Sequence, residues 1–184
     1  MIRRSRLLVV AATVGAAVAV FATGSAASTD DVESHGGVTV VREQLSGFNE
    51  TPVALSSPGN ASFVAVINDR NQEINYRLTY ADLPTTVTQA HVHFGNTQQS
   101  GGVSFFLCTN LGNGPAGTQA CPAAPATITG TIKPADVIGP AAQGIAAGEF
   151  AEIVKAIRAG FTYANIHTTA FPAGEVRSQL GHQH

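Results

Sequence analysis

The chain has 184 residues, of which 44% are hydrophobic and 12% charged, and 10 Lys and Arg against 12 Asp and Glu give a formal net charge of -2. This length corresponds to one domain, and the high apolar share with low net charge excludes an intrinsically disordered chain. A nucleic-acid-binding protein is also excluded, because that class needs a surplus of Lys and Arg to neutralise phosphates. The 19 Gly and 9 Pro, with few charges, are typical of a small all-β protein rich in turns.

The first 27 residues predict a secretory signal peptide. Arg3, Arg4 and Arg6 form a positive head, residues 7–21 are apolar, and residues 25–27 are small, as at a signal-peptidase site. The apolar run is shorter than the roughly 20 residues of a membrane-spanning helix, so a retained anchor is the weaker interpretation. We therefore expect an exported protein, secreted or held in the cell envelope, with no membrane span after signal cleavage and a flexible polar leader over residues 28–37.

Short runs of β-type residues separated by turn-forming segments follow from residue 38 onward. In residues 73–80 apolar and polar side chains alternate strictly, which predicts a half-buried antiparallel strand. Residues 147–159 instead place apolar side chains at helical spacing, which predicts one short amphipathic helix that covers an open end of the core. The sequence thus predicts an all-β, antiparallel, Greek-key-like β-sandwich of about eight strands. The expected strands span residues 38–45, 61–68, 73–80, 87–94, 103–108, 126–132, 161–168 and 175–180.

Cys108 and Cys121 are the two cysteines of the sequence. In an exported chain an even pair usually forms a disulfide. A catalytic thiol or a thiolate metal site is the alternative, which no Cys-x-x-Cys motif supports. We predict a disulfide that removes chain entropy worth about 3 kcal/mol.

His91 and His93 lie two apart on a predicted strand, so their side chains leave the same face. His167 has the corresponding parity on another strand, together with Asn165, and three imidazoles converge if these strands are neighbours. Neutral imidazole is a common ligand of copper and zinc, and three histidines with an open position form a known catalytic arrangement. A copper or zinc site at His91, His93 and His167 is therefore a hypothesis, beside the plainer interpretation that these histidines are polar surface or form hydrogen bonds with neighbouring loops.

The remaining histidines carry less information. His182 and His184 lie in the C-terminal tail, residues 182–184, where casual metal affinity says little about function. His35 lies in the predicted leader and has no visible partner.

Glu175 and Arg177 share a predicted strand face directly after a Pro-Ala-Gly turn. We assign them, with Asn165, to a structural network of ion pairs or hydrogen bonds that fixes this turn; a catalytic role requires one of them to meet the histidines. The sequence has no Gly-x-Ser-x-Gly, Walker, dinucleotide or His-Glu-x-x-His motif. An enzyme is therefore not the first expectation.

Five segments in a fixed order resemble the CHRD domain, the module named after chordin. They are LSGFNETP (residues 45–52), YRLTY (76–80), AHVHFG (90–95), YANIHT (163–168) and PAGEVR (172–177). The resemblance covers residues 38–181 and implies a secreted all-β domain that occurs alone in microbial exported proteins and in tandem in animal chordin. It implies no defined biochemical activity.

Residues 91–97, HVHFGNT, are also similar to the copper-binding strand of Cu/Zn superoxide dismutase, a β-sandwich with a disulfide. By this resemblance His91 and His93 match two copper ligands. The dismutase also has a His-rich zinc loop, whereas residues 96–103 contain no His. This difference argues against a dinuclear site and leaves a single-metal site open.

The first functional hypothesis is a secreted, non-enzymatic module that binds an extracellular ligand, protein or metal ion. The alternative is a copper-dependent redox enzyme resembling superoxide dismutase, with copper held by His91, His93 and His167. A third hypothesis is a structural role in an extracellular matrix or envelope.

Overall fold

The computed structural model describes residues 33–35 and 38–181, with side chains described from residue 38 onward. The predicted signal peptide, most of the leader, and the tail with His182 and His184 lie outside the described residues. Within the described part, the strands form one antiparallel sheet with the order β6-β5-β8-β9-β2-β3-β4-β7, and β1 pairs with β2. The strands are β1 (Glu33–His35), β2 (Val38–Ser46), β3 (Asn60–Asn68), β4 (Glu73–Ala81), β5 (Val87–Phe94), β6 (Val103–Thr109), β7 (Ala126–Ile132), β8 (Thr162–Thr168) and β9 (Val176–Leu180).

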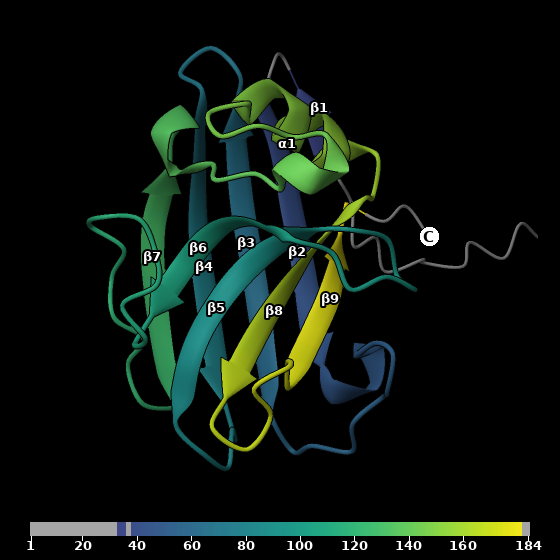
Figure 1. Cartoon of the computed structure of the whole chain (residues 1–184), viewed down its shortest axis with the longest axis vertical. Helices are drawn as coiled ribbons and strands as arrows, with labels where there is room; N and C mark the ends of the chain where they lie inside the picture. Colours follow the sequence, from purple (N-terminus) through teal and green to yellow (C-terminus); the bar gives the residue numbers. More distant parts are fainter. Residues whose placement is uncertain (1–32, 36–37, 182–184) are drawn as a thin grey trace, which may run out of the picture.

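The sheet folds over itself into two facing layers (Figure 1). One layer contains β2, β3, β4 and β7, the other contains β5, β6, β8 and β9, and the chain crosses between them three times, as in a Greek key. The all-β antiparallel prediction is confirmed. The two layers of the expected sandwich belong to one nearly closed, barrel-like sheet, because β9 pairs with β2 at Ser46 and Arg177.

The open seam of the barrel lies between the edge strands β6 and β7. The hydroxyl of Tyr76, on β4, donates to the carbonyl oxygen of Leu107 at 2.7 Å. The side-chain amide of Gln119 donates to the carbonyl oxygens of Leu107 at 3.3 Å and Thr129 at 3.0 Å, and so bridges the two edges. These contacts cover strand edges that are otherwise open to pairing with another chain.

The predicted disulfide is present between Cys108, at the end of β6, and Cys121. Both residues are buried in the core cluster. The bond indicates an oxidising compartment.

Burial differs between the two layers. In β4 buried and exposed residues alternate, as the period-2 pattern predicts. In β8 and β9 every residue is buried, so these strands are covered on both faces. One face packs in the core through Ala164, Ile166 and Val176, and the other lies under loops.

Three residues of the leader that we expected to be flexible form β1. Glu33 pairs with Val40, and His35 pairs with Val38. Because β9 meets β2 only at its far end, the start of β2 presents an unpaired edge that β1 occupies.

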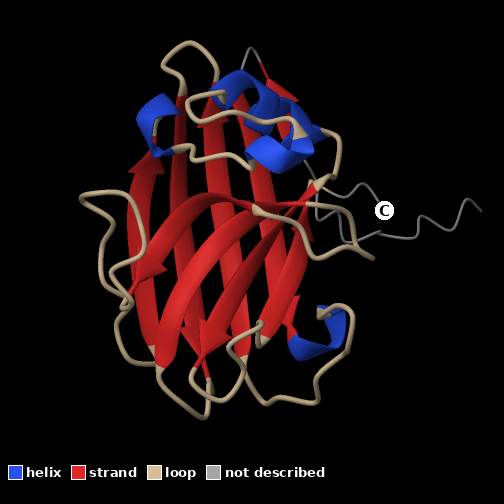
Figure 2. Cartoon of the chain, viewed as in Figure 1, coloured by secondary structure: helices blue, strands red, loops and turns tan. Residues whose placement is uncertain are grey.

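The helix α1 (Phe150–Arg158) covers one end of the barrel, as predicted (Figures 1 and 2). It is shorter than residues 147–159, because Gly148 has a left-handed φ of 84° that a helix does not accept. Ile153 and Ile157 point into the core and are 0% and 2% exposed. Three short 3-10 helices, η1 (Gly47–Asn49), η2 (Pro134–Asp136) and η3 (Ala141–Gln143), lie in connections.

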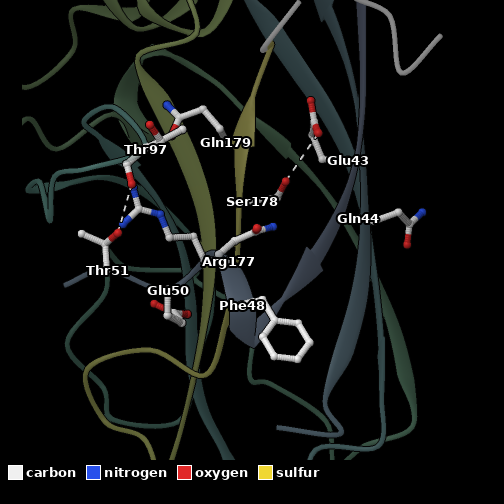
Figure 3. A pocket seen from close by; sticks show the side chains of 10 residues that line it. Glu43, Gln44, Phe48, Glu50, Thr51, Thr97, Arg177, Ser178 and Gln179 are labelled. Atoms are coloured by element: carbon white, nitrogen blue, oxygen red, sulfur yellow. Dashed lines mark hydrogen bonds between the residues drawn. The ribbon is translucent and has the colours of Figure 1, made fainter. Parts of the chain in front are cut away.

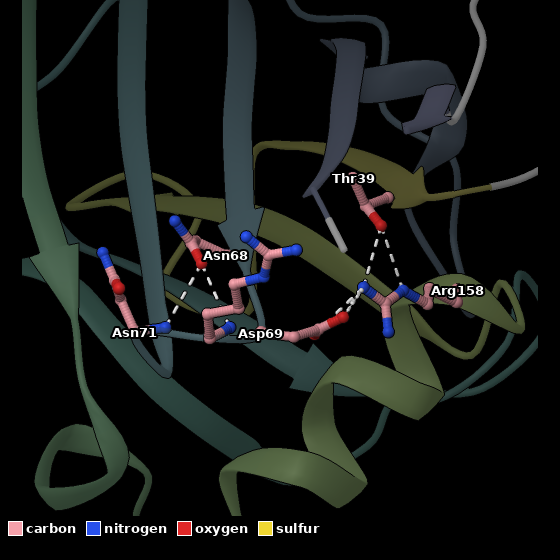
Figure 4. A network of polar contacts seen from close by, with 6 residues as sticks. Thr39, Asn68, Asp69, Asn71 and Arg158 are labelled. Atoms are coloured by element: carbon pink, nitrogen blue, oxygen red, sulfur yellow. Dashed lines mark hydrogen bonds and ion pairs between the residues drawn. The ribbon is translucent and has the colours of Figure 1, made fainter. Parts of the chain in front are cut away.

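Arg158 fastens α1 to the sheet (Figure 4). Its guanidinium donates to both carboxylate oxygens of Asp69, at 3.0 and 2.9 Å, and to the hydroxyl of Thr39. Thr39 is fully buried on β2, whereas Asp69 lies in the β3–β4 turn. The end of the barrel is thereby closed by both apolar packing and a charged tie. No helix in the described residues is both long enough and apolar enough to cross a membrane.

Candidate metal centre

The antiparallel pairing of β5 with β8 brings the three predicted histidines together. His91 lies directly opposite Asn165, and Gln89 lies opposite His167, so His167 is one diagonal step from His91. The ring centroids are 5.3 Å apart for His91 and His93, 5.0 Å for His91 and His167, and 5.9 Å for His93 and His167. The residues of opposite parity on these strands, such as Val92 and Ile166, pack in the core. The imidazoles therefore share the outer face of this layer.

Backbone carbonyls orient two of the imidazoles. Nδ1 of His93 lies 2.9 Å from the carbonyl oxygen of Gly101, and Nδ1 of His167 lies 3.1 Å from that of Pro172. A carbonyl only accepts, so Nδ1 carries the proton and Nε2 keeps a free lone pair. This is how histidine ligands of metals are usually held.

The Nε2 atoms of His91, His93 and His167 are buried and make no hydrogen bond with any described residue. Nδ1 of His91 also has no partner in that part of the chain. One candidate ligand atom from each histidine lies within 4.8 Å of the other two. A metal ion bound at about 2.0–2.1 Å requires such nitrogens to lie about 3.5 Å from one another, so the three rings must move closer together to share one ion. Among the described residues, no other group of three or more His, Cys, Asp or Glu meets this spacing.

Burial keeps the three imidazoles neutral. His91, His93 and His167 are 2%, 8% and 6% exposed. Desolvation lowers the pKa of His91 to about 2 and that of His93 to about 4, and it also lowers the pKa of His167. A metal binds the neutral form of histidine, so the site is ready to bind at neutral pH.

Aromatic rings enclose the imidazoles. The edge of His91 meets the ring of Phe106, on β6, with centroids 4.3 Å apart. The ring of Tyr163, on β8, is parallel to that of His93 at 4.8 Å. The Tyr163 hydroxyl accepts a hydrogen bond from the backbone N–H of Gly101, whose carbonyl holds His93. A side chain at Gly101 would collide with the carbonyl of Phe94, so this loop requires glycine.

Arg177 continues this stack on the neighbouring strand β9. Its guanidinium carbon lies 3.5 Å from the centroid of the Tyr163 ring, and its terminal nitrogen donates to the carbonyl oxygens of Asn96 and Gln99. Arg177 is 2% exposed. The residue thus ties the loop of residues 95–102 over the histidines.

Asn165 and Glu175 join other loops to the sheet. Asn165 donates to the carboxylate of Glu50 at 2.6 Å and to the carbonyl oxygen of Val176. Glu175 precedes β9 and accepts hydrogen bonds from the hydroxyls of Ser57 and Thr168, both at 2.5 Å. The three residues that we assigned to a structural network therefore all hold loops, but Glu175 bonds to hydroxyls rather than to Arg177.

Glu50 is the charged group at this site that the sequence did not single out. Burial raises its pKa to about 7, against the opposing effects of Asn165 and Arg177. Glu50 and Arg177 line a surface pocket of about 500 Å³ between η1 and β9 (Figure 3). The lining contains none of the three histidines, so this pocket does not open onto the histidine cluster.

The residues missed by the sequence are those that reach the site from loops or through rings: Glu50, Tyr163 and Phe106. Tyr163 could have been found from the sequence, because it lies in the expected strand 161–168 and its side chain leaves the same face as that of His167. Glu50 follows a turn-rich segment, and no spacing rule connects it with a strand more than a hundred residues away.

Comparisons with known proteins agree with the resemblance seen in the sequence. No curated protein and no solved structure gives a significant match to the chain. The model of the CHRD domain matches residues 41–180, which include β3 to β9, the disulfide and all three histidines. This chain belongs to the CHRD domain family.

Proposed function

We propose that this CHRD-domain protein is an exported, non-enzymatic binding module that holds one copper or zinc ion through His91, His93 and His167. The observation that carries this proposal is the gathering of three buried histidines, each with a ring nitrogen within 4.8 Å of those of the other two and each with an Nε2 atom that has no hydrogen-bond partner among the described residues. A buried polar atom left unpaired costs about 1–3 kcal/mol. Three such atoms in one cluster are accounted for by a shared ligand that accepts their lone pairs.

Burial of the histidines favours holding an ion over catalysis at it. A redox enzyme needs a position on the metal that substrate reaches, as in open three-histidine sites. Here the side chains are at most 8% exposed, and loops fastened by Arg177 and Asn165 cover them. The disulfide is consistent with export to an oxidising compartment. An extracellular ligand or protein partner of the module stays a proposal without an assigned surface.

The test is metal content by elemental mass spectrometry after loading with copper or zinc and dialysis. The chain has six histidines, which allows a matched comparison of two triple variants. One variant replaces His91, His93 and His167 by Ala, and the other replaces His35, His182 and His184. We expect about one ion per wild-type chain, the same content in the second variant, and loss of the ion in the first.

Two controls complete this test. Far-ultraviolet circular dichroism and the intact disulfide establish that each variant is folded. If only the tail variant loses the ion, the strand histidines are not the site. If the copper-loaded wild type dismutates superoxide and the strand variant does not, the enzymatic alternative replaces the binding module.

A further inference from the structure

We propose that the three-histidine site selects monovalent copper, Cu(I), over divalent zinc. The inference rests on the proposed function, because it names the ion that this site takes. It follows from the charge of the ligands, the charge around them and the number of ligands that the chain supplies.

The ligand set carries no charge. All three members are imidazoles, and no carboxylate belongs to the cluster among the described residues. The cost of moving an ion from water into a protein interior rises with the square of its charge, and even one unit is expensive. At 2–8% exposure the side chains leave solvent little access to the ion. A neutral, buried set of ligands therefore penalises a dication far more than a monocation.

The charged group stacked against the site is a cation. Only the ring of Tyr163 separates the guanidinium of Arg177 from His93, and two backbone carbonyls fix the guanidinium in place. At a separation of about 8 Å and an effective dielectric constant of about 20, each unit of ion charge then costs roughly 30-fold in affinity. Arg177 therefore disfavours zinc over Cu(I) by up to about that factor, which the partly ionised Glu50 nearby reduces.

The nearby carboxyl groups do not reverse this preference. Glu50 is held by Asn165 and lies near Arg177, which offsets its charge. Burial also raises the pKa of Glu50 to about 7, so it is only partly ionised at neutral pH. Glu175 is bound by the hydroxyls of Ser57 and Thr168.

The number of ligands points the same way. Zinc takes four ligands, and where the protein supplies only three the fourth is a water, whereas Cu(I), with a filled d shell and a single charge, is stable with three ligands. The described residues supply three nitrogens and no fourth His, Cys, Asp or Glu within the same distance. At 2–8% exposure the histidines leave little access for that water, so the three imidazoles satisfy Cu(I) but leave the fourth zinc position unfilled.

The experiment is an anaerobic competition on the metal-free full chain with its disulfide intact. The Cu(I) affinity is measured against bicinchoninate, and the zinc affinity against 4-(2-pyridylazo)resorcinol. We expect the wild type to bind Cu(I) more tightly than zinc by a factor of at least about 100, the product of the Arg177 effect and the cost of the unfilled fourth zinc position. X-ray absorption of the loaded protein should show a three-coordinate Cu(I) edge.

Variants of Arg177 test the electrostatic step. Arg177→Gln removes the charge and should narrow the preference by roughly 10- to 30-fold, whereas Arg177→Lys keeps the charge and should preserve it. Arg158→Gln, at the helix-covered end of the barrel, is the matched control and should leave the ratio of the Cu(I) and zinc affinities unchanged. The wild-type measurement stands even if an Arg177 variant does not fold.

Each outcome has a distinct meaning. Equal or tighter binding of zinc by the wild type overturns the selectivity and leaves the metal site standing. Binding of neither metal overturns both this inference and the proposed function. If the wild type prefers Cu(I) and Arg177→Gln shows the same preference, the site is selective for Cu(I), but the charge of Arg177 is not the cause.

Discussion

Acidification from pH 7 to 5 should destabilise the metal-free protein through its buried histidines. The pKa of His91 is lowered to about 2 and that of His93 to about 4, from an ordinary value of 6.5. The pKa values of the folded state lie below those of the unfolded state. The free energy of unfolding that the neutral histidines contribute is therefore fully present above pH 6.5, and it is lost as the pH falls toward 4 and then 2. Between pH 7 and 5 each of the two imidazoles lowers the free energy of unfolding by about 2 kcal/mol, so His91 and His93 together lower it by about 4 kcal/mol. His167 adds to the loss, since its pKa is also lowered.

Glu50 acts in the opposite direction. Its pKa is raised from 4.5 to about 7, so it contributes stability that is lost as the pH rises through 7 and gained as the pH falls. After allowance for its partial exposure, this gain is about 1–2 kcal/mol between pH 7 and 5. The wild type should therefore lose at least about 2 kcal/mol, and Glu50→Gln should lose at least about 4.

Urea unfolding at pH 5, 6 and 7, with the disulfide intact and a chelator present, measures these losses. A stability that is flat or rises toward pH 5 in both proteins would refute the assignment of neutral, buried imidazoles. Equal pH slopes in the two proteins would refute the role of Glu50 alone.

Three further changes test the fold. Replacing both Cys108 and Cys121 by Ser should lower the free energy of unfolding by about 3 kcal/mol, measured in urea; a loss below about 1 kcal/mol would contradict the loop-entropy reasoning. Ile153→Ala, at a fully buried position of α1, should cost about 2–5 kcal/mol in a thermal or urea melt, with the exposed Ala151→Gly as the surface comparison. Gly130→Ala places a Cβ 2.6 Å from the Tyr76 ring and should lower the free energy of unfolding by about 1–3 kcal/mol. An unchanged melting temperature would contradict this expected clash.

The sequence predicted the strands well because local chemistry decides them. β5 and β7 have the bounds expected from turn residues and β-branched runs, and the other predicted strands differ by one residue at an end. The period-2 rule failed where both faces are covered, as in β8. Its outer face reads as polar, and only the tertiary structure reveals that loops bury it.

The site was predictable only in part. Strand parity placed His91 and His93 on one face, and the shared parity of His167 suggested a third ligand. Whether the strands are neighbours depends on the sheet order, because β5 pairs with β8 across a separation of about seventy residues that no local pattern encodes. The contact between Glu50 and Asn165 has the same origin, since it joins a loop to a strand 115 residues away.

His91 is the member of the cluster whose presence the packing explains least. The imidazoles of His93 and His167 each anchor a backbone carbonyl, so the fold itself uses one of their nitrogens. Neither nitrogen of His91 has a hydrogen-bond partner among the residues that the structure describes, and the residue is 2% exposed and packs against Phe106. An apolar side chain of similar volume would fill this space without losing a hydrogen bond, and such exchanges are nearly neutral or stabilising. Packing therefore does not require a histidine at position 91, and the ion that we propose to be shared with its two oriented neighbours supplies a reason for one.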